Sequence, residues 1–143
     1  MADILQQFPI KAKRREVFRA VSTPAGLDRW WTKRSSGECT HGAEYQLWFG
    51  PEHDWRAVVS RCLPDSEFEL EIVSAQEDWL GTRVGFILKG NDGVTQVHFH
   101  HLGWPDSNEH YRISCYCWAM YLRLLKRYLE FGDVVPYENR LDV

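Results

Sequence analysis

Histidines are the side chains in this sequence best suited to acid–base or metal chemistry, and His98, His100 and His101 lie close together. Side chains alternate between the two faces of a strand, so His101 shares a face with Val97 and Phe99 and is expected to point into the core. An imidazole placed there can hold or transfer a proton. The simpler interpretation is a structural histidine, hydrogen-bonded to a tyrosine or a backbone carbonyl. No acidic residue lies beside it in the sequence to form a proton relay.

The other two histidines share the opposite strand face, where two imidazoles are close enough to hold a metal ion. No third ligand is evident beside His98 and His100, and a solvated sheet face is the simpler explanation of the pair. The sequence also lacks nucleophile elbows, Walker loops, zinc-protease motifs and dinucleotide-binding fingerprints. We therefore predict no metal and no cofactor, and we assign no catalytic residue.

Aromatic residues are abundant, with seven Trp, seven Phe and six Tyr among the 143 residues. Such rings either fill a core or line a pocket in which flat apolar ligands stack, and composition alone favours the filled core. Tyrosine hydroxyls and indole N–H groups would orient a polar group of the ligand. The residues predicted to contact a ligand are Trp31, Tyr45, Trp48, Phe86, Phe99, His101, Tyr111 and Trp118.

One long helix is expected to position many of these side chains. Apolar residues recur at steps of three or four between residues 107 and 131, which predicts a helix with one apolar stripe. Ser107 and Asn108 are candidate N-caps, and Gly132 is a stop signal. The stripe consists of Tyr111, Cys115, Trp118, Leu122, Leu125 and Leu129.

The preceding residues predict a first strand, two short helices, and then strands joined by turns. The helices are expected over residues 13–21 and from Pro24 to Trp31. Turn residues such as Gly90, Asn91, Asp92 and Gly93 predict hairpins. The predicted strands cover residues 4–11, 44–49, 55–62, 67–73, 82–89 and 94–102. This order predicts an α+β antiparallel fold that forms a single domain over residues 1–143.

Charge and composition exclude several classes of function. The net charge is −3 and no basic stripe is evident, which argues against nucleic-acid binding. Residues 1–8 lack an export signal and no apolar run is long enough to span a membrane, so we predict a cytoplasmic protein that does not bind membranes. The four cysteines contain no C-x-x-C spacing and are expected to be reduced thiols.

Several stretches together resemble the START-like (SRPBCC) superfamily. They are Glu16–Ala20, Thr23–Pro24 with Leu27, Trp30–Thr32, Gly81–Thr82, Phe99–Trp104 and Leu122–Glu130. In particular, the chain resembles relatives of the activator of the heat-shock-protein-90 ATPase, often labelled polyketide cyclase-like. This resemblance implies a helix-grip fold, in which a curved sheet of six or seven strands wraps round the C-terminal helix and encloses a deep cavity. Relatives commonly carry Gly-Trp where this chain has Cys117 and Trp118, so the bulkier Cys117 is expected to narrow that cavity or to alter the approach of the backbone there.

The prediction is therefore a small-molecule binding domain that encloses an apolar or aromatic ligand. One alternative is a cyclase, dehydratase or hydrolase acting on a polyketide-like substrate, with His101 and a tyrosine as acid and base. The other alternative is an interaction module that contacts a chaperone or another protein, as in the cochaperone relatives. Fold alone does not choose among these functions.

Overall fold

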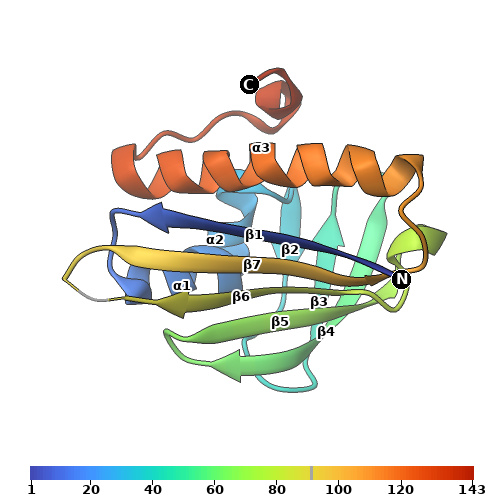
Figure 1. Cartoon of the computed structure of the whole chain (residues 1–143), viewed down its shortest axis with the longest axis horizontal. Helices are drawn as coiled ribbons and strands as arrows, with labels where there is room; N and C mark the ends of the chain where they lie inside the picture. Colours follow the sequence, from blue (N-terminus) through green and yellow to red (C-terminus); the bar gives the residue numbers. More distant parts are fainter. Residues whose placement is uncertain (91) are drawn as a thin grey trace.

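The computed structural model describes residues 1–90 and 92–143, and it contains one antiparallel sheet of seven strands. Neighbouring strands follow the order β1-β7-β6-β5-β4-β3-β2, so the chain runs as a meander from β2 to β7 and β1 pairs with the last strand (Figure 1). Asn91, which belongs to the predicted turn between the last two strands, lies outside the described residues. The strands are β1 (Ala2–Ile10), β2 (Arg34–Ser36), β3 (Glu44–Trp48), β4 (Asp54–Leu63), β5 (Glu67–Ser74), β6 (Arg83–Lys89) and β7 (Thr95–Trp104).

Alternation of apolar and polar residues correctly predicted which strand faces are buried. On β7, Thr95, Val97, Phe99 and His101 are buried, whereas the intervening side chains are partly exposed. The short strand β2 was not predicted, since three residues with two serines carry no hydrophobic pattern. It adds to the edge of the sheet through pairing of Ser35 with Leu47.

The helices begin and end at the expected signals. They are α1 (Arg14–Ser22), α2 (Pro24–Trp30) and α3 (Glu109–Phe131), with short 3₁₀ turns η1 (Glu77–Trp79) and η2 (Tyr137–Asp142). The Asn108 side chain accepts a hydrogen bond from the backbone N–H of Tyr111, and Gly132 closes α3 in the left-handed conformation. Thr23 caps α2 in the same way, with Pro24 at the first helical position.

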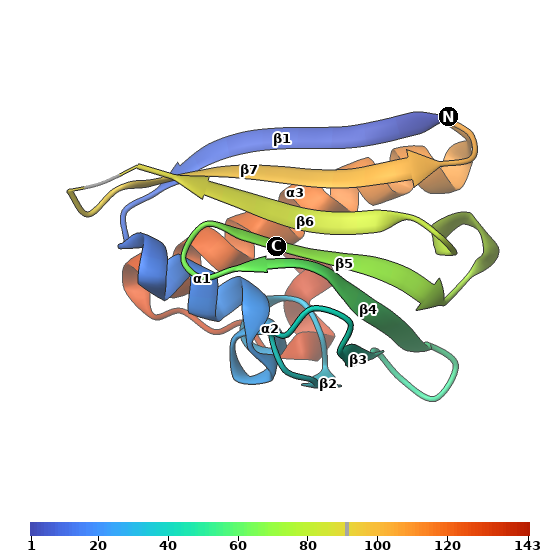
Figure 2. The ribbon, with the colours of Figure 1, turned by 90° about the horizontal axis from the view of Figure 1, so that it is seen from below.

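The sheet curves round α3, which lies across it with its apolar stripe facing inward. Trp118, Leu122 and Leu125 are buried, while Tyr111 and Leu129 towards the ends of the helix are half-buried. Viewed from below, α3 lies behind the sheet, and α1 and α2 lie beside the C-terminal end of α3 (Figure 2). These features confirm the predicted α+β helix-grip fold with two short helices after the first strand.

A second layer covers part of the outer side of α3. The C-terminal segment passes over the helix (Figure 1) and is held by Arg140, which is only 3% exposed. The Arg140 guanidinium donates hydrogen bonds to the backbone carbonyls of Asp28, Thr32 and Val135 at 2.8, 3.2 and 3.0 Å. One buried side chain therefore fixes the C-terminal segment to the end of α2.

The expectation of four reduced cysteines is wrong for one pair. Cys39 and Cys62 form a disulfide across 23 residues, whereas Cys115 and Cys117 are free. The loop between β2 and β3 brings Cys39 beside β4, and spacing along the sequence does not reveal such a long-range approach. The bond joins an irregular loop to a regular strand.

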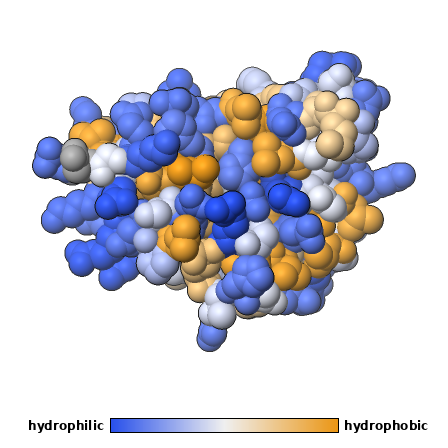
Figure 3. Space-filling model, turned by 60° about the horizontal axis from the view of Figure 1, so that its bottom comes forward, coloured by the Kyte–Doolittle hydropathy of each residue, from blue (hydrophilic) through white to orange (hydrophobic). Residues whose placement is uncertain are grey.

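Polar side chains dominate the outer face of the sheet, where separate apolar patches are interrupted by hydrophilic ones (Figure 3). Glu69 on this face is only 6% exposed and accepts hydrogen bonds from His100 Nε2 and Ser60 Oγ, both at 2.8 Å. These bonds, that of His100 first, hold the pKa of the Glu69 carboxyl below its ordinary value. The His100 ring lies directly over Gly85, since a Cβ added there would come within 2.4 Å of His100 Nε2.

None of the described helices is both long enough and apolar enough to cross a bilayer.

The burial of α3 sets a test of the fold. Because the Trp118 side chain is buried (2% exposed), Trp118→Ala should lower the free energy of unfolding by about 3–5 kcal/mol, measured by urea denaturation. Tyr116→Ala, a control on the same helix at 76% exposure, should change it by less than about 0.5 kcal/mol. A loss below about 1 kcal/mol for Trp118→Ala would contradict the arrangement of helix and sheet.

Candidate functional site

Aromatic rings fill the space between the sheet and α3. The Trp118 ring lies 4.6 Å from Phe99, 5.1 Å from Trp31 and 5.9 Å from Trp79, measured between ring centroids. Phe86 packs against Phe99 at 5.4 Å. Five of the predicted ligand-binding residues thus lie together in one cluster: Trp31, Phe86, Phe99, His101 and Trp118.

The other three predicted residues lie outside this cluster. Tyr45 is buried elsewhere, where its hydroxyl donates to the Ser22 carbonyl at 2.5 Å. Trp48 is half-buried beneath the Arg34 guanidinium, which lies 4.0 Å from the ring centroid. The Tyr111 hydroxyl donates to the Asp3 carbonyl at 2.7 Å and ties α3 to β1. Each of these side chains already has a structural partner.

His101 forms the centre of a hydrogen-bonded chain inside the cluster. The Trp118 indole can only donate, so its Nε1–H bond of 3.0 Å to His101 Nδ1 requires that this nitrogen carry no proton. His101 Nε2–H therefore donates to Thr82 Oγ1 at 2.8 Å, and the Thr82 hydroxyl donates to the Trp79 carbonyl at 2.6 Å. Both ring nitrogens are thus engaged, as expected for a structural histidine, but their partners are Trp118 and Thr82 and not a tyrosine or a backbone carbonyl.

Burial also keeps His101 neutral. The side chain is 0% exposed, and loss of solvation, with a smaller contribution from His100 and His110, lowers its pKa to about 3. A neutral imidazole without a free nitrogen cannot take up or deliver a proton near neutral pH. His101 therefore holds the core together and does not serve as the acid or base of the enzyme alternative.

An open cleft begins where the aromatic cluster reaches the surface. It has a volume of about 240 Å³, and a smaller hollow of about 30 Å³ lies at its base between Trp79, Trp118 and Cys117. Its walls come from the end of α2, the β3–β4 hairpin, η1, the first half of α3 and η2. The lining residues are Trp31, Phe49, His53, Trp55, Gln76, Trp79, His110, Ile113, Ser114, Cys117, Tyr121 and Tyr137.

Two buried polar atoms of the cleft residues lack a hydrogen-bond partner within residues 1–90 and 92–143. They are Trp79 Nε1, on a side chain that is 6% exposed, and His53 Nδ1. An unpaired buried N–H is costly, and a ligand acceptor that pairs with it recovers that cost. Burial raises the pKa of the Tyr121 hydroxyl to about 12, so this group stays a donor at neutral pH. The cleft therefore combines aromatic walls with hydrogen-bond donors.

Cys117 lies where the resemblance to the family predicted a narrowing. It lines both the cleft and the small hollow at its base, and burial raises the pKa of its thiol. The larger side chain therefore takes up space that glycine would leave open.

Sequence reasoning missed most of the lining residues. Ser114 and Tyr121 lie at helical spacing on either side of Cys117, next to the apolar stripe of α3, and this second periodic face could have identified them. His53, Gln76 and Trp79 come from turns and connections, whose positions depend on the curvature of the sheet. No local pattern identifies such residues.

In the part of the chain that the structure describes, no group of three His, Cys, Asp or Glu side chains is arranged to hold a metal ion.

The low pKa of His101 predicts a pH dependence of stability. In the unfolded chain the ring takes up a proton near pH 6.5, but in the folded protein only near pH 3, so stability falls as pH drops through this interval. Between pH 7 and pH 5, the loss of unfolding free energy attributable to His101 should be about 2 kcal/mol. Denaturation curves recorded at these two pH values should show that His101→Phe abolishes this loss. Replacing the exposed His41 by Phe should leave the pH profile unchanged, and a profile unaltered by His101→Phe would refute the assignment.

Comparison with known proteins identifies relatives of the same fold. A family model described as Activator of Hsp90 ATPase homolog 1-like protein matches residues 11–130. A comparison with curated protein sequences finds no match. The solution structure of the Aha1 dimer from Colwellia psychrerythraea is 28% identical, with a TM-score of 0.83 over 93% of this chain and 99% of that one.

Two further structures share the fold at lower identity. SSP2350 from Staphylococcus saprophyticus is 18% identical, with a TM-score of 0.77 over 94% of this chain and 96% of that one. CalU16 from Micromonospora echinospora is 19% identical, with a TM-score of 0.73 over 96% and 83% of the respective chains. Because the family model covers most of the chain, the protein belongs to the Activator of Hsp90 ATPase homolog 1-like family within the START-like superfamily.

Proposed function

We propose that residues 1–143 form one binding domain for a small, flat and largely apolar molecule that carries a hydrogen-bond acceptor. The ligand lies in the cleft beside the first half of α3. The observation that carries this proposal is the unpaired, buried Nε1–H of Trp79, a residue that lines a cleft walled by aromatic rings. A ring system stacked there would bury apolar area and pair its acceptor with this indole.

The size of the cleft limits the ligand to one or two fused rings. Its volume of about 240 Å³ is below the range of about 300–1,000 Å³ typical of pockets for drug-sized ligands. The space that the resemblance predicted as a deep cavity is occupied by Trp118 and Phe99, which are 2% and 1% exposed. Binding is therefore proposed at the surface end of the aromatic cluster.

A matched pair of compounds tests the proposed hydrogen bond. Quinoline and naphthalene have nearly the same shape, but only quinoline has an acceptor nitrogen. Quinoline should bind about 2–10-fold more tightly, which corresponds to the net contribution of one hydrogen bond. Amide NMR titrations should show the largest shift changes at Trp55, Trp79, Cys117 and Tyr121, which line the cleft.

Substitutions locate the effect. Trp79→Phe keeps a ring but removes the N–H, so it should abolish the preference for quinoline over naphthalene. Trp48→Phe, outside the cleft, should preserve it. A preference that survives Trp79→Phe, or shift changes that gather on the outer sheet face, would contradict binding in this cleft.

One observation favours a second function, general base catalysis on the bound molecule. His110 lines the cleft, and its Nδ1–H donates to Asp78 Oδ2 at 3.0 Å. This bond leaves Nε2 of the neutral ring without a proton and able to accept one. The same carboxylate oxygen accepts a bond of 3.4 Å from Asn108, so the pair also joins η1 to the start of α3.

Turnover separates the two functions. If His110 acts as a base, the protein should hydrolyse 4-nitrophenyl acetate, and His110→Gln should lower the rate at least about 100-fold, as expected for loss of general base catalysis. Cys117→Ser controls for reaction at the free thiol in the cleft. A rate unchanged by His110→Gln would exclude this second function and leave binding intact.

We propose that the binding domain acts in the cytoplasm. The Cys39–Cys62 disulfide is unusual for that compartment, where thiols are generally kept reduced. Contact with a chaperone or another protein, the third function considered, would use surfaces outside the cleft.

A further inference from the structure

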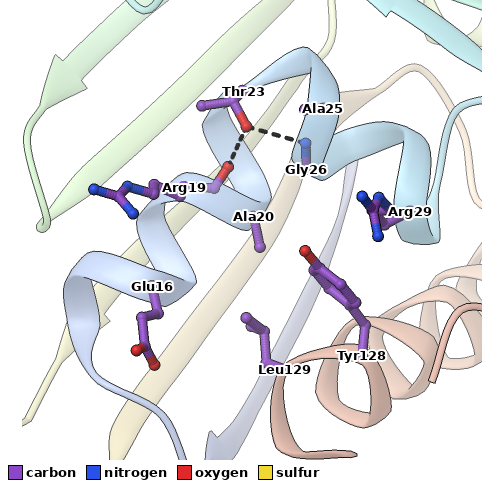
Figure 4. A pocket seen from close by; sticks show the side chains of 9 residues that line it. All are labelled: Glu16, Arg19, Ala20, Thr23, Ala25, Gly26, Arg29, Tyr128 and Leu129. Carbon is purple, nitrogen blue, oxygen red and sulfur yellow. Dashed lines mark hydrogen bonds between the residues drawn. The ribbon is translucent and has the colours of Figure 1, made fainter. Parts of the chain in front are cut away.

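A second hollow lies near the other end of α3, where α1 and α2 pack against its last turns (Figure 4). This groove has a volume of about 460 Å³. It shares no residue with the cleft. The lining residues are Glu16, Arg19, Ala20, Thr23, Ala25, Gly26, Arg29, Tyr128 and Leu129.

Small and apolar groups form much of the surface of the groove. Ala20 and Gly26 bring α1 and α2 into close contact, since a Cβ added at Gly26 would lie 2.6 Å from the Ala20 Cα atom. Thr23 Oγ1 donates to the Arg19 carbonyl at 2.7 Å and accepts from Gly26 N–H at 3.0 Å, which satisfies the polar groups between the helices (Figure 4). Leu129 extends from α3 toward this surface, which can therefore receive an apolar side chain.

The rim of the groove is basic. Residues 11–29 contain six basic and two acidic side chains, a net charge of +4, although the whole chain carries −3. None of these six cations forms an ion pair with any described residue. Arg19 and Arg29 line the groove and are exposed, and the Arg29 guanidinium lies 5.7 Å from the centre of the Tyr128 ring. Glu16 is the acidic residue of the lining.

We propose that this groove binds an acidic segment of a partner protein. An apolar side chain of that segment would occupy the surface between Ala20, Ala25 and Leu129. Carboxylates on either side of it would pair with Arg19 and Arg29, and further acidic residues would face Lys13, Arg14 and Arg15 along α1. The proposal is independent of the cleft ligand, because the two sites share no residue.

Energetics favour a peptide over a small anion. Each exposed ion pair contributes little on its own because solvent screens it, so a single carboxylate or phosphate would bind weakly. A segment with several carboxylates and one buried apolar side chain adds these small contributions over one surface. A membrane fits less well, since none of residues 11–29, all described by the structure, is a large exposed hydrophobic residue that could insert into lipid.

The test uses the full chain and a fluorescein-labelled synthetic peptide in which pairs of glutamates flank a central leucine. Fluorescence anisotropy at low salt should show saturable binding that weakens as salt is added. The matched peptide with glutamine in place of glutamate should bind at least about tenfold more weakly. Amide NMR with the acidic peptide should shift Ala25 and Gly26, which line the groove.

A pair of double variants distinguishes the groove from general electrostatics. Arg19→Glu with Arg29→Glu should weaken binding at least about tenfold. Arg56→Glu with Arg61→Glu changes the net charge equally but lies on β4, so it should change affinity less than about twofold. Circular dichroism and urea denaturation establish that each variant is folded.

Three results would overturn the proposal. The first is equal binding of the glutamine peptide. The second is an equal effect of the two double variants. The third is tighter binding of phosphatidylserine-containing vesicles or a DNA duplex than of the peptide, with the same dependence on Arg19 and Arg29.

Discussion

The hydrogen bond between Trp118 and His101 is the interaction on which the rest of this structure depends. A bulky indole from α3 enters the concave side of the sheet, and its N–H must find an acceptor because water cannot reach it. His101 supplies that acceptor from β7, and Thr82 passes the chain of bonds on to the backbone of η1. Helix, sheet and the connection before β6 are thereby fixed relative to one another.

This arrangement determines where space remains for the proposed ligand. Aromatic rings packed against one another occupy the space between sheet and helix, so the space left beside the cluster lies where the cluster ends, between η1, the β3–β4 hairpin and α3. Trp79, whose buried N–H is unpaired, lines the cleft at this boundary. Cys117 lines the cleft and the hollow at its base from the helix side.

Local sequence patterns predicted the elements because each pattern reports a local physical requirement. The spacing of Trp118, Leu122 and Leu125 reports one buried helix face, and the alternation through Val97, Phe99 and His101 reports one buried strand face. Gly132 and Asn108 marked the ends of α3 through their backbone and capping preferences. These signals, together with resemblance to the family, were sufficient for the fold.

The site was harder to predict because it depends on where distant segments meet. Trp31, Phe86, Phe99, His101 and Trp118 were correctly expected to lie together, since each falls on an inward face. Whether their rings enclose a cavity or fill it depends on distances of an ångström or so, which periodicity does not encode. The position of Trp79 and the Cys39–Cys62 bond likewise depend on connections that carry no periodic signal.

The two proposed binding surfaces are joined by α2. Its exposed side contributes Ala25, Gly26 and Arg29 to the basic groove, while its end supplies the Asp28 and Thr32 carbonyls that hold Arg140. Through the C-terminal segment, Arg140 helps to place Tyr137, which lines the cleft.

Coupling between two sites requires an element with two arrangements that both ligands favour unequally. The aromatic cluster is closely packed, with Trp118 and Phe99 only 2% and 1% exposed. The contacts of Arg140 with α2 involve only backbone carbonyls and a surface segment. Any influence of a partner at the groove on the cleft would therefore pass through α2 with Arg140, or along α3, which contributes residues to both surfaces.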